Sequence, residues 1–380
     1  MKIGILTLPS TFNYGGILQA YALQHSLDNL GYDNIILQRE RSVNAVNNKS
    51  LKALCKNLIK KVLGRDAYTI PNESQRNFIE IECRKFIKSN LRKTQRVAYD
   101  TDSMLRLCDE NNIDTVIVGS DQVWRPHMTA DIRNYFLDFC NEKMTKIAYA
   151  ASFGVDKWEF SKEDTLVCSD LAKKFQLVTV REDSGVKLCD EFLGVEAKHV
   201  LDPTMLLSPE DYISLVEKSR VGKSEGNLFY YILNENNAKS NFVKEISNRY
   251  GLKPFKVMPE RDAYFNYNAD KHIEECVYPS PVAWIRAFID AECVVTDSFH
   301  GTVFSIIFNK PFWTIGNKSR GNARFESLLK MFHLEHRYIS DIESLKIEDQ
   351  VMSIDWNEVN KIRQEKRDFS LKLLREALNG

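Results

Sequence analysis

The sequence has few of the features that disulfide or metal chemistry requires. Its eight cysteines are scattered without a CxxC pair, and no cysteines or histidines fall at the spacing of a zinc site. Most of these cysteines lie in apolar stretches, where a thiol usually packs as a small reduced core residue. We therefore predict a protein that uses no disulfide, no metal and no other cofactor.

The chain also lacks a net charge and long apolar runs. It has 52 basic and 52 acidic residues, so its formal net charge is zero. A neutral molecule has no overall field to attract nucleic acid, and we expect no nucleic-acid partner. No apolar run approaches the roughly 20 residues of a membrane span. Residues 2–8 resemble a strand and not a signal peptide. This pattern predicts a cytoplasmic protein.

One segment allows contact with a membrane surface. Residues 51–63 place their apolar side chains on one helical stripe, with lysines elsewhere around it at Lys52, Lys56, Lys60 and Lys61. A basic amphipathic helix of this kind can lie at the inner face of a membrane. It can also pack its stripe on the protein's own core, which is the interpretation that we favour.

Strand-like and helix-like segments alternate over most of the chain, which predicts an α/β protein with parallel sheets. A length of 380 residues favours two domains over one. We expect two Rossmann-like domains, with a boundary near residue 205 where the pattern is interrupted by polar, Pro-containing sequence. The predicted units are residues 1–205, residues 206–350, and a terminal helix in 351–380 that packs back across both domains.

The most informative stretch is 291–311. It indicates a buried strand over 293–296, a polar turn, and an apolar helix over 302–308. A turn between a strand and a helix exposes N–H groups that favour anions, and this one contains His300, a side chain suited to proton transfer near neutral pH. Alternatively, Asp297 and Ser298 cap the helix and His300 is an ordinary surface residue.

Four polar turns follow predicted strands in this way: 13–16, 119–124, 181–185 and 297–301. In open α/β sheets, ligands bind beyond the carboxyl ends of the strands. Four such turns can therefore converge on one cleft between the two domains, which is where we expect the active site.

The residues in these turns resemble the polysaccharide pyruvyl transferase family. The resemblance covers most of the chain and rests on these motifs in order: Asn13-Tyr-Gly-Gly16, Gly119-Ser-Asp-Gln-Val-Trp124, Ala148-Tyr-Ala-Ala-Ser-Phe-Gly154, Arg181-Glu-Asp-Ser184, Leu201-Asp-Pro203 and Thr296-Asp-Ser-Phe-His-Gly-Thr302. It implies a glycosyltransferase-B-like pair of Rossmann domains. It also implies transfer of a pyruvyl group from phosphoenolpyruvate to a sugar of a cell-surface polysaccharide or its lipid-linked precursor, forming a pyruvate ketal.

The chain departs from the family pattern at one position. The resemblance implies an arginine two residues before the histidine of the last motif, but Ser298 stands there. Arg324 and Arg320 follow the next strand and are the obvious substitutes.

Ketal formation requires proton transfer and recognition of a doubly anionic donor. We assign proton transfer to His300, and acceptance of a hydroxyl proton or orientation of the sugar to Asp121, which could instead cap its turn. Guanidinium groups suit phosphate and carboxylate, which favours Arg181 and Arg324. The residues assigned to the donor are Arg181, Ser298, Gly301, Thr302 and Arg324.

The residues assigned to substrate more generally are Asn13, Tyr14, Gly15, Gly16 and Trp124. The first four precede a helix and offer backbone N–H groups, although an ordinary turn would also need its glycines. Trp124 could stack on a sugar face or be a buried anchor.

Two other functions fit the same pattern. A nucleotide-sugar glycosyltransferase of the glycosyltransferase-B type would use the same scaffold. A sugar- or anion-binding protein without turnover would keep the fold, and Ser298 in place of an arginine favours that interpretation.

Overall fold

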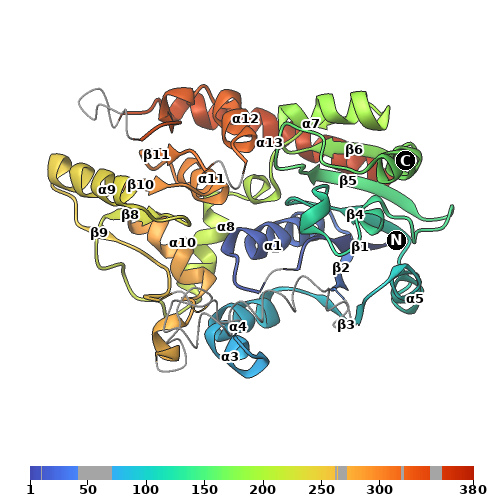
Figure 1. Cartoon of the computed structure of the whole chain (residues 1–380), viewed down its shortest axis with the longest axis horizontal. Coiled ribbons are helices and arrows are strands. Elements are labelled where there is room, and N and C mark those ends of the chain that lie inside the picture. Colours follow the sequence, from blue (N-terminus) through green and yellow to red (C-terminus); the bar gives the residue numbers. More distant parts are fainter. Residues whose placement is uncertain (10, 42–70, 262, 264–271, 318–320, 343–352) are drawn as a thin grey trace, which may run out of the picture.

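The chain folds around two parallel sheets, as seen in a computed structural model that describes residues 1–9, 11–41, 71–261, 263, 272–317, 321–342 and 353–380 (Figure 1). The first sheet has seven strands in the order β3-β2-β1-β4-β5-β6-β7, and the second has five in the order β12-β11-β10-β8-β9. Adjacent strands run parallel in both sheets. The predicted α/β architecture of two Rossmann-like domains is confirmed.

The strands of the first sheet are β1 (Lys2–Leu6), β2 (Asp33–Arg39), β3 (Lys93–Ala98), β4 (Thr115–Val118), β5 (Thr145–Ala151), β6 (Leu177–Val180) and β7 (Lys198–His199). Those of the second are β8 (Leu228–Tyr231), β9 (Pro254–Phe255), β10 (Cys293–Thr296), β11 (Phe312–Ile315) and β12 (Tyr338–Ile339). Central strands such as β4 and β10 are buried along their whole length. Helices cover both faces of a parallel sheet, which explains why these strands are continuous apolar runs.

The helices of the first sheet's half are α1 (Tyr14–Asn29), α3 (Glu73–Ile79), α4 (Ile81–Asn90), α5 (Thr101–Glu110), α6 (Lys162–Ala172) and α7 (Asp183–Leu188). They are followed by α8 (Pro209–Glu217), α9 (Asn237–Tyr250), α10 (Pro281–Asp290), α11 (Phe299–Ile307), α12 (Ala323–Met331) and α13 (Trp356–Asn379).

The two halves share one hydrophobic core. The first turns of α1 contribute Tyr14 and Leu18 to a cluster that also contains Trp284 and Phe304 from the second half. The rings of Tyr14 and Trp284 stack with their centroids 5.6 Å apart. Because apolar burial crosses the boundary, the two halves meet at an interface that is packed among the described residues.

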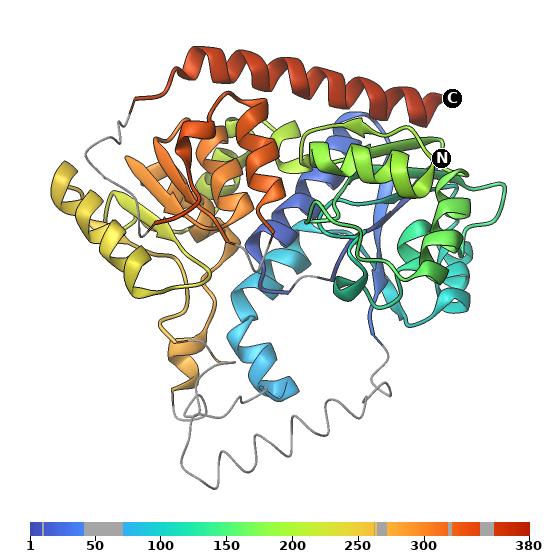
Figure 2. The ribbon, with the colours of Figure 1, turned by 45° about the horizontal axis from the view of Figure 1, so that its top comes forward.

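The terminal helix α13 lies along both halves of the molecule (Figure 2). Arg363 donates to the carbonyl of Ile307 in the second half, and Leu374 belongs to a core cluster of the first. The strands of the two sheets come from residues 2–199 and 228–339. The exact boundary at residue 205 stays a prediction.

Within the described residues, no helix has the length and apolar character needed to cross a membrane. The same part of the chain contains no group of three or more histidine, cysteine, aspartate or glutamate side chains placed to hold a metal ion. The predicted amphipathic helix at 51–63 and Arg320 lie outside the described residues.

Candidate functional site

Helix α11 begins earlier than the sequence pattern predicts. It starts at Phe299 and not at Thr302, so His300 lies in its first turn instead of in the preceding loop. Ser298 is the N-cap residue, and its hydroxyl accepts from the N–H of Gly301 at 3.5 Å. The capping role considered for Ser298 is therefore observed, and its hydroxyl is directed to its own helix.

Gly301 and Thr302 hold α11 against β10. A Cβ on Gly301 would lie 2.2 Å from Oγ1 of Thr296, so glycine is required for this close approach. The fully buried hydroxyl of Thr302 bonds the carbonyl of Ser298 at 3.2 Å and Oγ1 of Thr314 at 2.8 Å. Both residues therefore contribute to packing, and their donor-binding roles stay predictions.

His300 lies between two residues of the first half of the chain. Its Nε2 is 3.5 Å from Oδ2 of Asp202, at the distance of an ion pair. On its other side, a Cβ on Gly15 would come within 2.0 Å of its Nδ1. The imidazole is only 7% exposed, but its neighbours are a carboxylate and a glycine backbone, so it retains a polar environment.

Asp202 is the centre of this buried network. Its Oδ2 accepts from Nη1 of Arg181 at 2.8 Å, and its Oδ1 accepts from both the N–H and the hydroxyl of Thr204 at 3.0 and 2.7 Å. Burial opposes the charge of this carboxylate, but the His300 and Arg181 charges hold its pKa well below the usual range. The sequence pattern assigned no role to Asp202, although it lies in the quoted Leu201-Asp-Pro203 motif.

Two guanidinium groups flank one aromatic ring. The Arg181 guanidinium lies 4.4 Å from the centroid of Phe299, and that of Arg324 lies 5.6 Å from it. Arg181 also pairs with Asp121, with Nη2 and Oδ1 3.3 Å apart. Arg324 is buried.

The charges on these two arginines are affected differently. Burial disfavours the charge of Arg181, but Asp202 and Asp121 outweigh it and raise its pKa. Burial, and then the repulsion of Arg181, lower the pKa of Arg324 to about 10. The charge of Arg181 is therefore balanced by Asp202 and Asp121, whereas burial and Arg181 both oppose the charge of Arg324.

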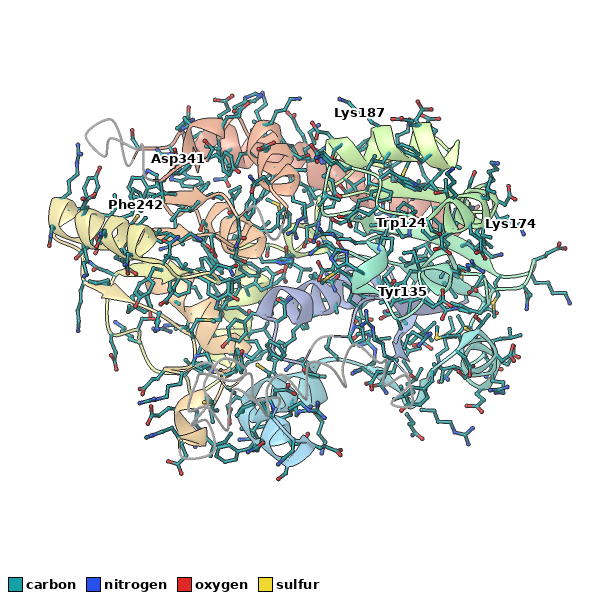
Figure 3. The ribbon with its side chains drawn as sticks, viewed as in Figure 1. Trp124, Tyr135, Lys174, Lys187, Phe242 and Asp341 are labelled. Carbon is teal, nitrogen blue, oxygen red and sulfur yellow. The ribbon has the colours of Figure 1, made fainter. Side chains whose placement is uncertain are left out.

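The turn after β4 contributes Asp121 but not Trp124. Trp124 is fully buried, its ring stacks on Phe136, and its indole N–H donates to the carbonyl of Tyr135 at 2.9 Å. Figure 3 labels Trp124 and Tyr135 within the first half of the molecule. The predicted stacking of Trp124 on a sugar is therefore wrong, and the alternative of a buried anchor is observed.

The residues of the turn before α1 also have different roles. The side chain of Asn13 caps α1 by accepting from the N–H of Gly16 at 3.3 Å. The hydroxyl of the buried Tyr14 donates to the carbonyl of Pro279 at 2.9 Å, so this side chain joins the two halves and does not face a ligand. Of the four residues predicted here, Gly15 is the one against His300.

A buried residue of α1 connects two of these turns, and the sequence pattern did not single it out. Gln19 accepts from the N–H of Ser120 at 3.1 Å and donates to Oγ1 of Thr7 at 2.9 Å. A polar residue in the middle of an apolar helix face is a signal that could have found it, because buried amides need partners.

Several side chains of this region have a buried polar atom without a hydrogen-bond partner among the described residues. They include Nε of Arg181, Oε2 of Glu182 and Oγ of Ser184. Nε2 of His300 is also in this group, although it lies 3.5 Å from Oδ2 of Asp202. Buried polar atoms of this kind cost free energy unless something pairs with them.

The profile of one family, polysaccharide pyruvyl transferase, matches residues 13–319, a span that contains His300, Asp202, Arg181 and Asp121 but not Arg324. The chain belongs to the polysaccharide pyruvyl transferase family. It is therefore a member of a transferase family. A comparison with curated proteins gives no match.

Solved structures resemble the chain in fold. The UDP-GlcNAc 2-epimerase of Neisseria meningitidis, bound to UDP-GlcNAc, is 12% identical, with 98% of this chain and 94% of that chain covered and a TM-score of 0.48. The UDP-GlcNAc 2-epimerase of Methanocaldococcus jannaschii is 11% identical, with 96% and 92% covered and a TM-score of 0.47. The spinosyn rhamnosyltransferase SpnG, complexed with thymidine diphosphate, is 12% identical, with both chains fully covered at 100% and a TM-score of 0.43. Because the likeness is so weak, the nucleotides of those proteins say nothing about the ligand of this chain.

Proposed function

We propose that this protein transfers the pyruvyl group of phosphoenolpyruvate to a sugar of a cell-surface polysaccharide or of its lipid-linked precursor. The products are a cyclic pyruvate ketal and phosphate. The observation that carries the proposal is that His300 is held against Asp202, while two guanidinium groups flank the ring of the preceding residue, Phe299. One junction then combines a proton-transfer group with the positive charge that a doubly anionic donor needs.

The two arginines supply the donor's electrostatic partners. Phosphoenolpyruvate carries a phosphate and a carboxylate, and a guanidinium can bind either through two parallel hydrogen bonds. Arg324 also supplies the guanidinium that is missing at Ser298, the position where the family pattern has an arginine. It brings a guanidinium to the ring of Phe299, the residue next to Ser298. In this proposal Arg324 takes over the donor-binding role from another point in the fold.

His300 and Asp121 carry the protons. The imidazolium of His300 gives a proton to the methylene carbon of the donor, and a sugar hydroxyl attacks the resulting oxocarbenium-like carbon. The proton of that hydroxyl returns to the imidazole or passes to Asp121. The bond to phosphate then breaks as a second hydroxyl closes the ring, and its proton leaves with the phosphate. Asp202 stabilises the imidazolium and orients its ring.

The proposal needs no cofactor, because two fixed guanidiniums meet the donor's charge. It places the enzyme in the cytoplasm, at the inner face of the membrane when the acceptor is lipid-linked. No nucleic acid takes part.

The test is to incubate the protein with phosphoenolpyruvate and a panel of aryl and lipid-linked glycosides. We expect phosphate release together with a mass increase of the acceptor. In parallel, phosphoenolpyruvate should raise the thermal unfolding temperature more than a nucleoside diphosphate does. The opposite order of protection, with no phosphate release, would favour a nucleotide-sugar glycosyltransferase. Binding of phosphoenolpyruvate without any turnover would instead favour a binding protein.

A further inference from the structure

Glu182 follows Arg181 directly but faces another part of the molecule. Its backbone is extended, with φ −123° and ψ 146°, and neighbouring side chains in an extended segment point in opposite directions. While Arg181 reaches Asp202 and Phe299, the fully buried carboxylate of Glu182 lies under the loop that follows β5.

One oxygen of Glu182 holds this loop. Oε1 accepts from the N–H of Phe153 at 2.7 Å, from the N–H of Gly154 at 3.0 Å and from the hydroxyl of Ser152 at 3.1 Å. Three donors on one buried oxygen fix the position of the loop. Losing that oxygen would remove the acceptor of the Phe153 N–H and of the Ser152 hydroxyl, while the N–H of Gly154 would keep its second acceptor, Oγ of Ser152 at 3.0 Å.

The loop held by Glu182 touches the second half of the chain at Gly321. A Cβ on Gly321 would lie 1.9 Å from the carbonyl oxygen of Gly154, and Gly321 has a φ of +88°, which favours glycine. The next residue, Asn322, starts α12: its carbonyl accepts from the N–H of Phe325 at 2.9 Å. Arg324 lies in this first turn, so the Gly154–Gly321 contact lies directly before the arginine of the candidate site.

We infer that Glu182 is a positioning residue for Arg324, acting through the loop 152–154 and its contact with Gly321. Two adjacent residues then determine where both guanidiniums of the site lie. Arg181 carries one of them, and Glu182 positions that of Arg324 across the interface. The consequence for the donor rests on the function proposed above, but the structural link between Glu182 and α12 does not.

Three variants test whether Glu182 positions Arg324 through this loop: Glu182→Ala, Glu182→Gln and Gly321→Ala. Alanine removes the acceptor oxygen. Glutamine keeps an oxygen at the position of Oε1 and places its NH2 group at the position of Oε2, which has no hydrogen-bond partner within the described structure. Gly321→Ala disturbs the same contact from the other half. Gly31→Ala is the matched control, because Gly31 has a similar φ of +85° and a Cβ there meets nothing within 4 Å.

We expect Glu182→Ala and Gly321→Ala each to raise the KM for phosphoenolpyruvate by about tenfold, with kcat reduced by less than about threefold. Glu182→Gln should restore a KM near that of the wild type. The double variant Glu182→Ala/Gly321→Ala should be no worse than either single variant, since both break one contact. The inference would be overturned if kcat fell while KM stayed unchanged. It would also be overturned if the effects of the two substitutions on KM multiplied in the double variant.

Hydrogen–deuterium exchange gives a readout that does not depend on activity. In Glu182→Ala the amides of Phe153 and Gly154 should exchange faster, and so should the segment 322–326 in the other half. Faster exchange at 152–154 with no change at 322–326 would overturn the inference. If the wild type does not turn over phosphoenolpyruvate, the proposed function fails, and the exchange experiment still decides whether Glu182 positions α12. If Glu182→Ala does not fold, Glu182→Gln and Gly321→Ala carry the same comparison.

Discussion

The imidazole of His300 lies directly against the α-carbon of Gly15, although the two residues come from different halves of the chain. A single methyl group on Gly15 would lie 2.0 Å from Nδ1 of His300. The first turn of α1 therefore shapes the space around the proposed proton-transfer group.

Gly15→Ala should reduce kcat strongly, by about 100-fold, because the new methyl group displaces the imidazole from Asp202. Helix propensity alone predicts the opposite direction for stability, since alanine within a helix is favoured over glycine by about 1 kcal/mol. We expect the clash to cancel that gain. Steady-state kinetics and thermal unfolding test this, with Gly222→Ala as control. An active, stabilised variant would show that His300 does not depend on Gly15.

His300→Ala should lower kcat by about 100-fold or more, as expected when a general acid is removed. Binding of phosphoenolpyruvate should remain, because the guanidiniums of Arg181 and Arg324 are untouched. Single-turnover phosphate release and calorimetric titration measure the two effects separately. A wild type without turnover, with most of the affinity kept in His300→Ala, would instead indicate a binding protein.

Asp202→Asn should destabilise the protein by about 3 kcal/mol at neutral pH, because Arg181 and His300 lose their buried counter-charge. The folded-state pKa of Asp202 lies below its unfolded value of about 3.9, so this stabilisation is present above that value and is lost as the pH falls below it. Urea unfolding from about pH 7 to about pH 3 should show the gap to wild type narrowing. Asp170→Asn, at a residue whose side chain is 79% exposed, should change little. A gap that does not vary with pH would contradict the charge argument.

Arg324→Met should stabilise the fold while weakening donor binding. Burial and the Arg181 charge lower the pKa of Arg324 to about 10, so the guanidinium stays charged at neutral pH and its charge costs free energy in the folded state. Removing that charge should raise the free energy of unfolding by about 1–3 kcal/mol, while the KM for phosphoenolpyruvate rises. Arg220→Met, at an exposed position, is the control and should alter neither quantity. A destabilised variant with normal KM would assign Arg324 a structural role.

Trp124→Phe should act on stability and not on sugar binding. The indole is fully buried and donates to Tyr135, so the smaller ring leaves a gap and an unpaired carbonyl, at a cost of about 2 kcal/mol. The KM for the acceptor sugar should be unchanged. An effect on that KM alone would restore the stacking role that the buried position excludes.

The sequence placed the framework of the site well, and the reasons are local. Strand β10 was predicted at its exact bounds, 293–296, because a buried parallel strand is a continuous apolar run bounded by polar residues. The start of α11 was missed by three residues because Ser298 caps it, so a polar segment that resembled a turn is already helical. The partner of Asp297 could not be predicted from the local sequence either. Its fully buried carboxylate pairs with Lys239, a residue far away along the chain, at 2.7 Å.

The amino-acid order by itself determined that polar turns carrying His300, Arg181, Asp121 and Gly15 follow parallel strands, because strand and helix periodicity are local properties. Only the tertiary structure decided which members of those turns face one another. It selected Asp202 as the partner of His300, turned Trp124, Gly301 and Thr302 into packing residues, and brought Arg324 to the ring of Phe299. The physical reason is that pairing of buried charges and close packing across an interface depend on distances between segments far apart in sequence, which local patterns do not contain.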